Sequence, residues 1–175
     1  MKLHHALTLI ACGLVLTGCG KKEAAPAAAA PSAAPTASAP AAAPAATPAA
    51  AVIEITANDA MKFNVTRFEV AAGQQVKLTL RNIGTMPKAA MGHNLVILKK
   101  DADVKAFADA AVMAAATEYF PAAKADQAIA HTKLLGPKQS EEIVFTAPAE
   151  AGEYPFICSF PAHFIAGMKG VMVVK

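Results

Sequence analysis

Three residues with metal-binding side chains lie close together near the end of the chain, in the segment CSFPAHFIAGMKG at residues 158–170. Cys158, His163 and Met168 follow one another at intervals of five residues. A thiolate, an imidazole and a thioether suit soft or borderline metals, and two histidines with one cysteine and a weak axial methionine form the blue-copper pattern. Methionine is a poor ligand for zinc, whose structural sites use four strong ligands, so the set favours copper.

A second histidine has to come from another part of the fold. Outside the N-terminal region the remaining candidates are His93 and His131. His93 opens the apolar stretch HNLVIL and follows Gly92, whose missing side chain lets the backbone come close to a metal. His131 has polar and charged neighbours on its C-terminal side, which indicate an exposed position. The sequence therefore predicts His93 as the second histidine ligand.

The N-terminus predicts export. A start that carries Lys2 precedes an apolar run from Ala6 to Leu16, about half of the roughly 20 residues that a membrane-spanning helix needs, which is typical of a secretory signal. The folded part of an exported chain would then keep Cys158 as a single cysteine. Free thiols are unusual in oxidising compartments, so this cysteine favours a ligand role.

The segment LTGC at Leu16 to Cys19 resembles the lipobox of bacterial lipoproteins. The resemblance implies a signal peptide at residues 1–18, a lipid on Cys19, and an exported protein anchored to a membrane that faces the periplasm or the cell exterior. Gly20 after the anchor cysteine favours the outer membrane of a two-membrane cell. Residues 19–51 are then a tether, predicted to be disordered because alanine and regularly spaced proline build neither a helix nor a core.

Residues 52–175 are predicted to be one folded domain of 124 residues. With 13 basic and 12 acidic side chains the domain is nearly neutral, which excludes an electrostatic nucleic-acid site. Short β-branched or alternating segments recur between glycines and prolines, so we expect an all-β sandwich or barrel. The segment at residues 101–120 is rich in helix formers and predicts one inserted helix with Asp101 as its N-cap.

Four segments resemble azurin and its relative auracyanin, which are members of the cupredoxin family. They are MKFN, MPKAAMGHN, IAHTKLLG and CSFPAHFIAGMKG, and they extend across nearly the whole domain. The resemblance implies a Greek-key β-sandwich or barrel with one type 1 copper and one-electron transfer as its function. It also implies the ligands, which are His93, Cys158, His163, Met168 and, as a weak fifth ligand, the backbone carbonyl of Gly92.

The same resemblance implies how electrons would enter and leave. The Asn94 side chain and the Phe160 backbone N–H should support the Cys158 sulfur, and the edge of His163 should be the electron-transfer point. An apolar rim around that edge should include Met61, Met91, Phe160, Pro161 and Ala162. Such a rim suits brief, weak encounters with redox proteins such as c-type cytochromes, oxidases or reductases.

The chain departs from azurin at several positions. The interval from His163 to Met168 is one residue longer and in this respect resembles auracyanin. Leu95 replaces a tryptophan, the two disulfide cysteines are absent, and Asn82 takes the place of a histidine that senses pH in azurins. These changes leave the predicted ligand set intact.

A copper enzyme such as a nitrite reductase needs a second copper site with several more histidines, and only His93, His131 and His163 lie outside the signal segment. Four protein ligands leave no open coordination position, which predicts a carrier and not an enzyme. The alternative is a lipoprotein that binds and delivers copper without a redox role, and the reduction potential with the electron self-exchange rate would distinguish the two.

Overall fold

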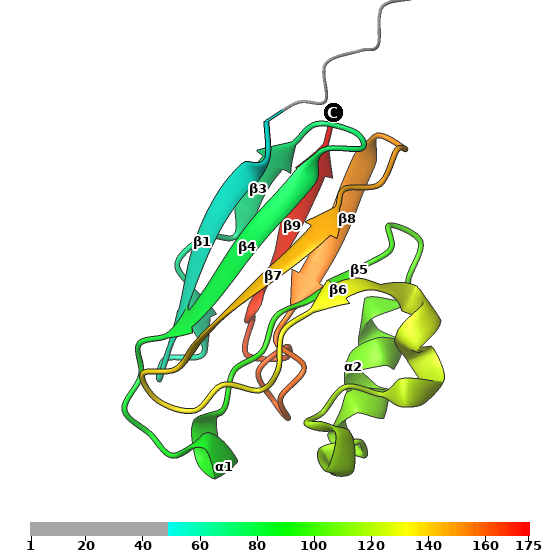
Figure 1. The fold of residues 1–175 in the computed structure, drawn as a ribbon. Helices are drawn as coiled ribbons and strands as arrows, with labels where there is room; N and C mark the ends of the chain where they lie inside the picture. Colours follow the sequence, from blue (N-terminus) through cyan, green and yellow to red (C-terminus); the bar gives the residue numbers. More distant parts are fainter. Residues whose placement is uncertain (1–48) are drawn as a thin grey trace, which may run out of the picture. The chain divides into compact units, whose positions relative to one another are not determined.

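A computed structural model describes residues 49–175, which form two β-sheets packed face to face (Figure 1). The strands of this part are β1 (Ala51–Asn58), β2 (Lys62–Phe63), β3 (Arg67–Val70), β4 (Gln75–Asn82), β5 (Val96–Leu98), β6 (Ala128–His131), β7 (Ser140–Thr146), β8 (Gly152–Ile157) and β9 (Lys169–Val174). The helical segments are α1 (Lys88–Met91), α2 (Val104–Val112) and the 3-10 turns Ala115–Thr117 and Ala122–Gln127. The all-β fold that the sequence predicted is confirmed.

The chain alternates between the two sheets. One sheet has the strand order β2-β1-β4-β7, and the other has the order β3-β9-β8-β5-β6. Two neighbouring pairs, β1 with β4 and β3 with β9, are parallel, because the chain changes sheets between their members. The strand β9 therefore lies between β3, an early strand, and β8. This sheet thus contains strands from both ends of the domain sequence.

The main core lies between the sheets. In β4, Val76, Leu78 and Leu80 are fully buried while Lys77 and Arg81 are exposed. This two-residue period is expected because one face of the strand packs in the core and the other faces solvent. These apolar side chains belong to one cluster with Phe156 and Met172 of the opposite sheet. Burial of this cluster supplies the main driving force for folding.

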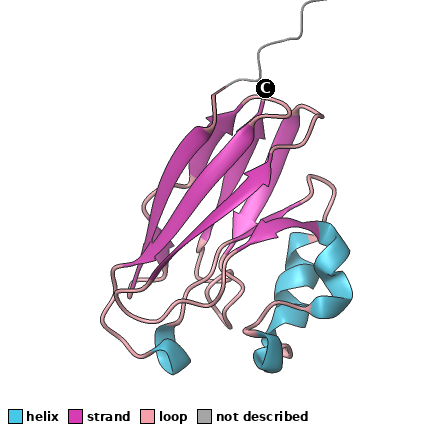
Figure 2. Cartoon of the chain, viewed as in Figure 1, coloured by secondary structure: helices cyan, strands magenta, loops and turns pink. Residues whose placement is uncertain are grey.

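The strand β5 is buried on both faces, which explains its uninterrupted apolar sequence. Ile97 belongs to the main core, whereas Val96 and Leu98 pack against Phe107 of α2 in a second, smaller cluster. Helix α2 therefore covers the outer face of this sheet (Figure 2). Its packing fixes the helix beside the segment that follows β8.

The predicted N-cap of this helix was wrong by two residues. Asp103, not Asp101, caps α2, and its carboxylate accepts the Ala106 N–H at 2.9 Å. Asp101 lies in the preceding turn, in which the Ala102 N–H bonds to the Lys99 carbonyl, and this turn leaves Asp103 in the extended conformation of a cap. The helix is also shorter than residues 101–120. It ends at Val112, and the 3-10 turn that follows ends where Glu118 adopts left-handed backbone angles.

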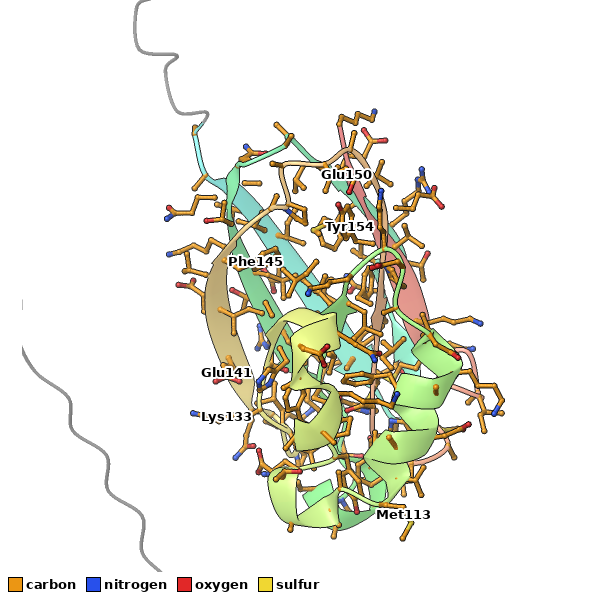
Figure 3. All side chains as sticks on the ribbon, turned by 90° about the vertical axis from the view of Figure 1, so that its right-hand side faces the viewer. Met113, Lys133, Glu141, Phe145, Glu150 and Tyr154 are labelled. Atoms are coloured by element: carbon orange, nitrogen blue, oxygen red, sulfur yellow. The ribbon has the colours of Figure 1, made fainter. Side chains whose placement is uncertain are left out.

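The two ends of the domain differ in character. The C-terminus and the start of β1 lie at one end, and α1 with the segment joining β8 to β9 lies at the other (Figure 1). Figure 3 shows Met113, just after α2, at this second end, while Glu150 and Tyr154 lie near the first. Within residues 49–175 none of the helices has both the length and the apolar character that crossing a membrane requires.

Candidate metal centre

The predicted ligands come from two segments that are far apart in sequence. His93 follows α1 and pairs with Leu135 in an isolated β-bridge, with N–H to carbonyl distances of 3.1 and 2.8 Å. Cys158 directly follows β8, and Met168 directly precedes β9. The Cys158 N–H donates to the Met168 carbonyl at 3.1 Å, so this hydrogen bond closes the segment that contains His163.

The side chains of these residues converge. The Cys158 Sγ lies 3.4 Å from His163 Nδ1 and 4.0 Å from His93 Nδ1. The ligand atoms of His93, Cys158 and His163 all lie within 4.8 Å of one another. His93, Cys158 and Met168 are fully buried, and His163 retains 2% exposure. The structure thus brings together the histidine, cysteine and histidine that the sequence selected, with the methionine buried at the end of the same segment.

These separations fit a single metal ion. With metal–sulfur and metal–nitrogen bonds of about 2.3 and 2.0–2.1 Å in a trigonal arrangement, sulfur and nitrogen would be about 3.8 Å apart. The observed separations of 3.4 and 4.0 Å bracket this value. Only small movements are therefore needed for the three side chains to hold one ion.

The ionisation states of the centre suit a metal cation that takes the place of the Cys158 thiol proton. Burial raises the pKa of Cys158 to about 12, an effect partly opposed by hydrogen bonds from the backbone of Asn94 and Phe160. Burial, together with the nearby His93, lowers the pKa of His163 to about 4, and burial also lowers the pKa of His93. At neutral pH the protein alone therefore presents a thiol and two neutral imidazoles, and a metal would displace the thiol proton.

The other ring nitrogen of His93 is poorly satisfied. Its Nε2 is buried and has no partner of hydrogen-bond geometry within the described residues. The Asn58 carbonyl acts in the direction of raising the pKa of His93, but burial outweighs it. The ring is thus held mainly by packing and by the backbone bridge to Leu135.

A buried polar clamp connects the two ligand segments. The Asn94 Oδ1 accepts the Ser159 N–H at 2.8 Å, and Asn94 Nδ2 donates to Ser159 Oγ at 2.8 Å. Ser159 Oγ in turn donates to the Tyr119 carbonyl at 2.7 Å. Because each residue of the clamp is adjacent in sequence to a ligand, these bonds set the distance between His93 and Cys158. In this arrangement the Asn94 side chain bonds to Ser159, and its backbone N–H is the group directed at the sulfur.

Gly92 is required by close packing. A Cβ at this position would lie 2.7 Å from the Lys88 carbonyl oxygen and 2.9 Å from Leu134 Cγ. Its backbone angles, φ −68° and ψ 147°, are accessible to any residue. The reason for glycine here is therefore the approach of α1 and Leu134 to the backbone beside His93.

The predicted apolar rim differs in exposure from residue to residue. Ala162 is exposed, Met61, Met91 and Pro161 are half-buried, and Phe160 is 8% exposed with its ring 4.7 Å from that of His163. Met61 also packs against the main core. Beside this rim the sequence analysis missed Ile165, which is 85% exposed although it lies between His163 and Met168. Its apolar type within the ligand segment was the available signal.

His131 lies outside the centre. It is exposed at the end of β6, as its neighbours indicated, and its ring stacks on Phe120 with centroids 3.9 Å apart. Asn82 is buried, and its side chain accepts the Gly84 N–H and donates to the Leu135 carbonyl. Cys19 and the predicted signal and tether lie outside the described residues, apart from the tether's last three positions.

Comparisons with known proteins cover the same part of the chain. Residues 49–175 match the family described as copper binding proteins, plastocyanin/azurin family. Azurin-2 of Alcaligenes xylosoxydans xylosoxydans is 40% identical over 121 residues, which are 67% of this chain and 92% of that protein. The outer membrane protein H.8 of Neisseria meningitidis serogroup B is 42% identical over 113 residues, which are 62% of this chain and 60% of that protein.

Solved structures give the same result. The crystal structure of dithionite-reduced auracyanin from Roseiflexus castenholzii has a TM-score of 0.65 and 40% identity, and the match covers 73% of this chain and 98% of that one. Auracyanin A from Chloroflexus aurantiacus, titled a blue copper protein, has a TM-score of 0.64 and 33% identity, over 72% of this chain and 99% of that one. The matched share corresponds to the two-sheet domain that carries the centre.

Proposed function

Because this chain belongs to the plastocyanin/azurin family of copper-binding proteins, we propose that it shuttles single electrons between redox proteins outside the cytoplasm. The observation that carries the proposal is the buried convergence of His93, Cys158 and His163 beside Met168. This donor set fits one type 1 copper, which supplies a one-electron couple when bound.

The first contribution is a fixed geometry. Electron transfer is fast when the ligands move little between the two oxidation states. The β-bridge at His93, the clamp between Asn94 and Ser159, and the hydrogen bond between Cys158 and Met168 hold both ligand segments from outside the metal. Because these contacts are made between protein atoms, they do not depend on the oxidation state of the bound ion.

The second contribution is exclusion of substrates. Four protein side chains surround the centre, and three of them are fully buried. A substrate would need an open coordination position, which this arrangement does not offer. We therefore propose a carrier and not an enzyme.

The third contribution is a point of electron exchange. His163 is the ligand with residual exposure, and Ala162 and Pro161 precede it on the surface. The apolar rim, extended to Ile165, would exclude water from the contact with a partner protein. The complex would still be weak and short-lived, as electron-transfer encounters require. Redox proteins such as c-type cytochromes, oxidases or reductases are the proposed partners.

The cellular location is also a proposal. The lipobox-like segment ending at Cys19 supports lipid attachment and export, and the similarity to a protein named outer membrane protein H.8 agrees with it. Replacement Cys19→Ala should abolish incorporation of labelled palmitate and shift the chain from the detergent phase to the aqueous phase. Wild-type protein that partitions into the aqueous phase would contradict the anchor.

The central test is the spectrum of the copper-loaded chain. Wild type with Cu(II) should be intensely blue because of charge transfer from the Cys158 sulfur, and Cys158→Ser should lose this band while its far-UV circular dichroism stays unchanged. The loaded protein should also show a reversible one-electron couple and fast electron self-exchange. A blue protein with an irreversible couple or slow exchange would instead favour copper delivery.

A further inference from the structure

The segment between His163 and Met168 has few hydrogen bonds to the rest of the protein, although Phe164 near its start packs against the smaller cluster around Phe107. Its amides bond within the segment itself or to its start, as in the bonds from Gly167 N–H to the Phe164 carbonyl at 3.0 Å and from Met168 N–H to the His163 carbonyl at 2.9 Å. Ile165 in its middle is 85% exposed. Packing of His163, Phe164 and Met168 fixes the two ends of the turn, but its middle, residues 165–167, needs another contact to be fixed relative to the sheets.

One side chain from a distant strand makes that connection. Lys62 of β2 donates from Nζ to the Ala166 carbonyl at 2.8 Å. Within residues 49–175 this is the one hydrogen bond that leaves the stretch 164–167 for a segment distant in sequence. The same Nζ lies 3.1 Å from the point where a side chain on Gly167 would begin, and Gly167 has φ +91°.

The strand geometry explains why Lys62 is available for this contact. Phe63, the next residue, is 5% exposed in the main core, so alternation directs Lys62 to the opposite side. The strand β2 is fixed to β1 by the pairs of Asn58 with Lys62 and Ala57 with Phe63. Lys62 therefore extends from the edge of one sheet to the turn that precedes Met168.

We infer that Lys62 is a positioning residue for the Met168 thioether. By binding the Ala166 carbonyl, it fixes the turn between His163 and Met168 against β2 and so limits how far Met168 moves relative to Cys158 and the two histidines. The inference rests on the proposed function, in which Met168 is the weak ligand.

The test uses full-length protein with three substitutions. Lys62→Met removes donor and charge, Lys62→Arg keeps both, and Lys77→Met removes the same charge from an exposed lysine of β4 that pairs with Glu142 and does not touch the turn. In the metal-free protein, hydrogen exchange at the Gly167 and Met168 amides should be about three- to tenfold faster in Lys62→Met than in Lys77→Met, the change expected for one net hydrogen bond. Lys62→Arg should exchange like wild type.

The second readout is the copper–thiolate spectrum, which depends on the geometry that the thioether completes. Its bands should shift in Lys62→Met and remain at their wild-type positions in Lys62→Arg and Lys77→Met. Equal exchange and equal spectra in Lys62→Met and Lys77→Met would overturn the inference. Faster exchange with an unshifted spectrum would also overturn it, because Lys62 would then stabilise the turn without positioning the ligand. Failure of the proposed function is a separate result, since wild type itself would then lack the blue band.

Discussion

The clamp between Asn94 and Ser159 is the contact whose loss should affect the metal centre most without touching a ligand. Asn94 is 1% exposed and Ser159 is 2% exposed, so water cannot replace the bonds between them. Replacement Asn94→Ala removes the acceptor of the Ser159 N–H and one partner of its hydroxyl. It leaves the backbone N–H of residue 94, which is directed at the sulfur, in place.

The expected size of the effect follows from what remains unpaired. The Ser159 N–H becomes a buried donor without an acceptor, which costs about 1–3 kcal/mol. The hydroxyl still bonds to the Tyr119 carbonyl, and the lost volume is small, so we add about 1 kcal/mol for the cavity. The metal-free protein should therefore lose about 2–4 kcal/mol in its free energy of unfolding, measured by urea denaturation.

A matched control exists in the same sheet system. The side chain of Asn64 accepts the Thr56 N–H at 2.6 Å at an exposed position, where water can replace it. Asn64→Ala should therefore cost below about 1 kcal/mol. After copper loading, Asn94→Ala should also show a shifted thiolate band, whereas Asn64→Ala should not. Equal stability of the two variants would refute the reasoning that this clamp holds the ligand segments together.

Three further predictions concern single positions. Because the folded state lowers the pKa of His163 to about 4 from its ordinary value near 6.5, the contribution of this residue to the stability of the metal-free protein is complete above pH 6.5 and falls by about 2–3 kcal/mol as the pH drops to 4. Burial of His93, which also lowers its pKa, acts in the same direction, and urea unfolding at both pH values should show the loss. Gly92→Ala should destabilise the protein by a few kcal/mol in thermal unfolding, because its Cβ would meet the Lys88 carbonyl at 2.7 Å, and Gly136→Ala, whose nearest neighbour is a side-chain atom at 3.2 Å, should be milder. Ala162→Asp should slow electron self-exchange about tenfold or more and leave the blue band unchanged, because a charge enters an apolar contact. Ala162→Asn is the uncharged control, and equal self-exchange rates for the two variants would place the point of electron exchange elsewhere.

Strands in which apolar and polar residues alternate were predictable from the sequence, because burial of one face produces a two-residue period. β4 and β7 show it directly, with Val76, Leu78 and Leu80 inside and Lys77 and Arg81 outside. Two short strands, β2 and β6, show no such period. β2 contains only two residues, and β6, AIAH, shows no period because it lies at a sheet edge with its residues half-buried. Periodicity carries no signal over such short or evenly exposed segments.

The candidate centre was predictable as far as the types of its side chains determine which metal they bind. Cysteine, histidine and methionine at even spacing select the metal class. Gly92 was predicted to let the backbone approach a metal, and the close contacts that the structure shows there are with Lys88 and Leu134. The supporting hydrogen bonds were not predictable from residue types, because they join residues distant in sequence. The resemblance implied Asn94, but as a support of the Cys158 sulfur and not as the partner of Ser159. Lys62 and Ala166 are 104 positions apart, and Asn94 and Ser159 are 65 apart. Lysine and serine are also common surface residues, so only the fold shows that Lys62 contacts the Ala166 carbonyl and that Ser159 contacts Asn94.

Metal removal should leave this domain folded. Cys158, Met168 and Leu95 belong to the main hydrophobic cluster, so the ligand segments are fixed by packing between the sheets as well as by their hydrogen bonds. A centre held only by its ion would come apart when the ion is removed, as small metal-dependent domains do. We therefore expect the metal-free chain to unfold in one cooperative transition, and the His93, Cys158 and Ser159 amides, which donate to Leu135, Met168 and Asn94, to keep protection from hydrogen exchange close to that of the β4 amides. Loss of protection at these three amides, with β4 still protected, would show that the metal and not the protein assembles the centre, and the argument for a fixed geometry during electron transfer would then fail.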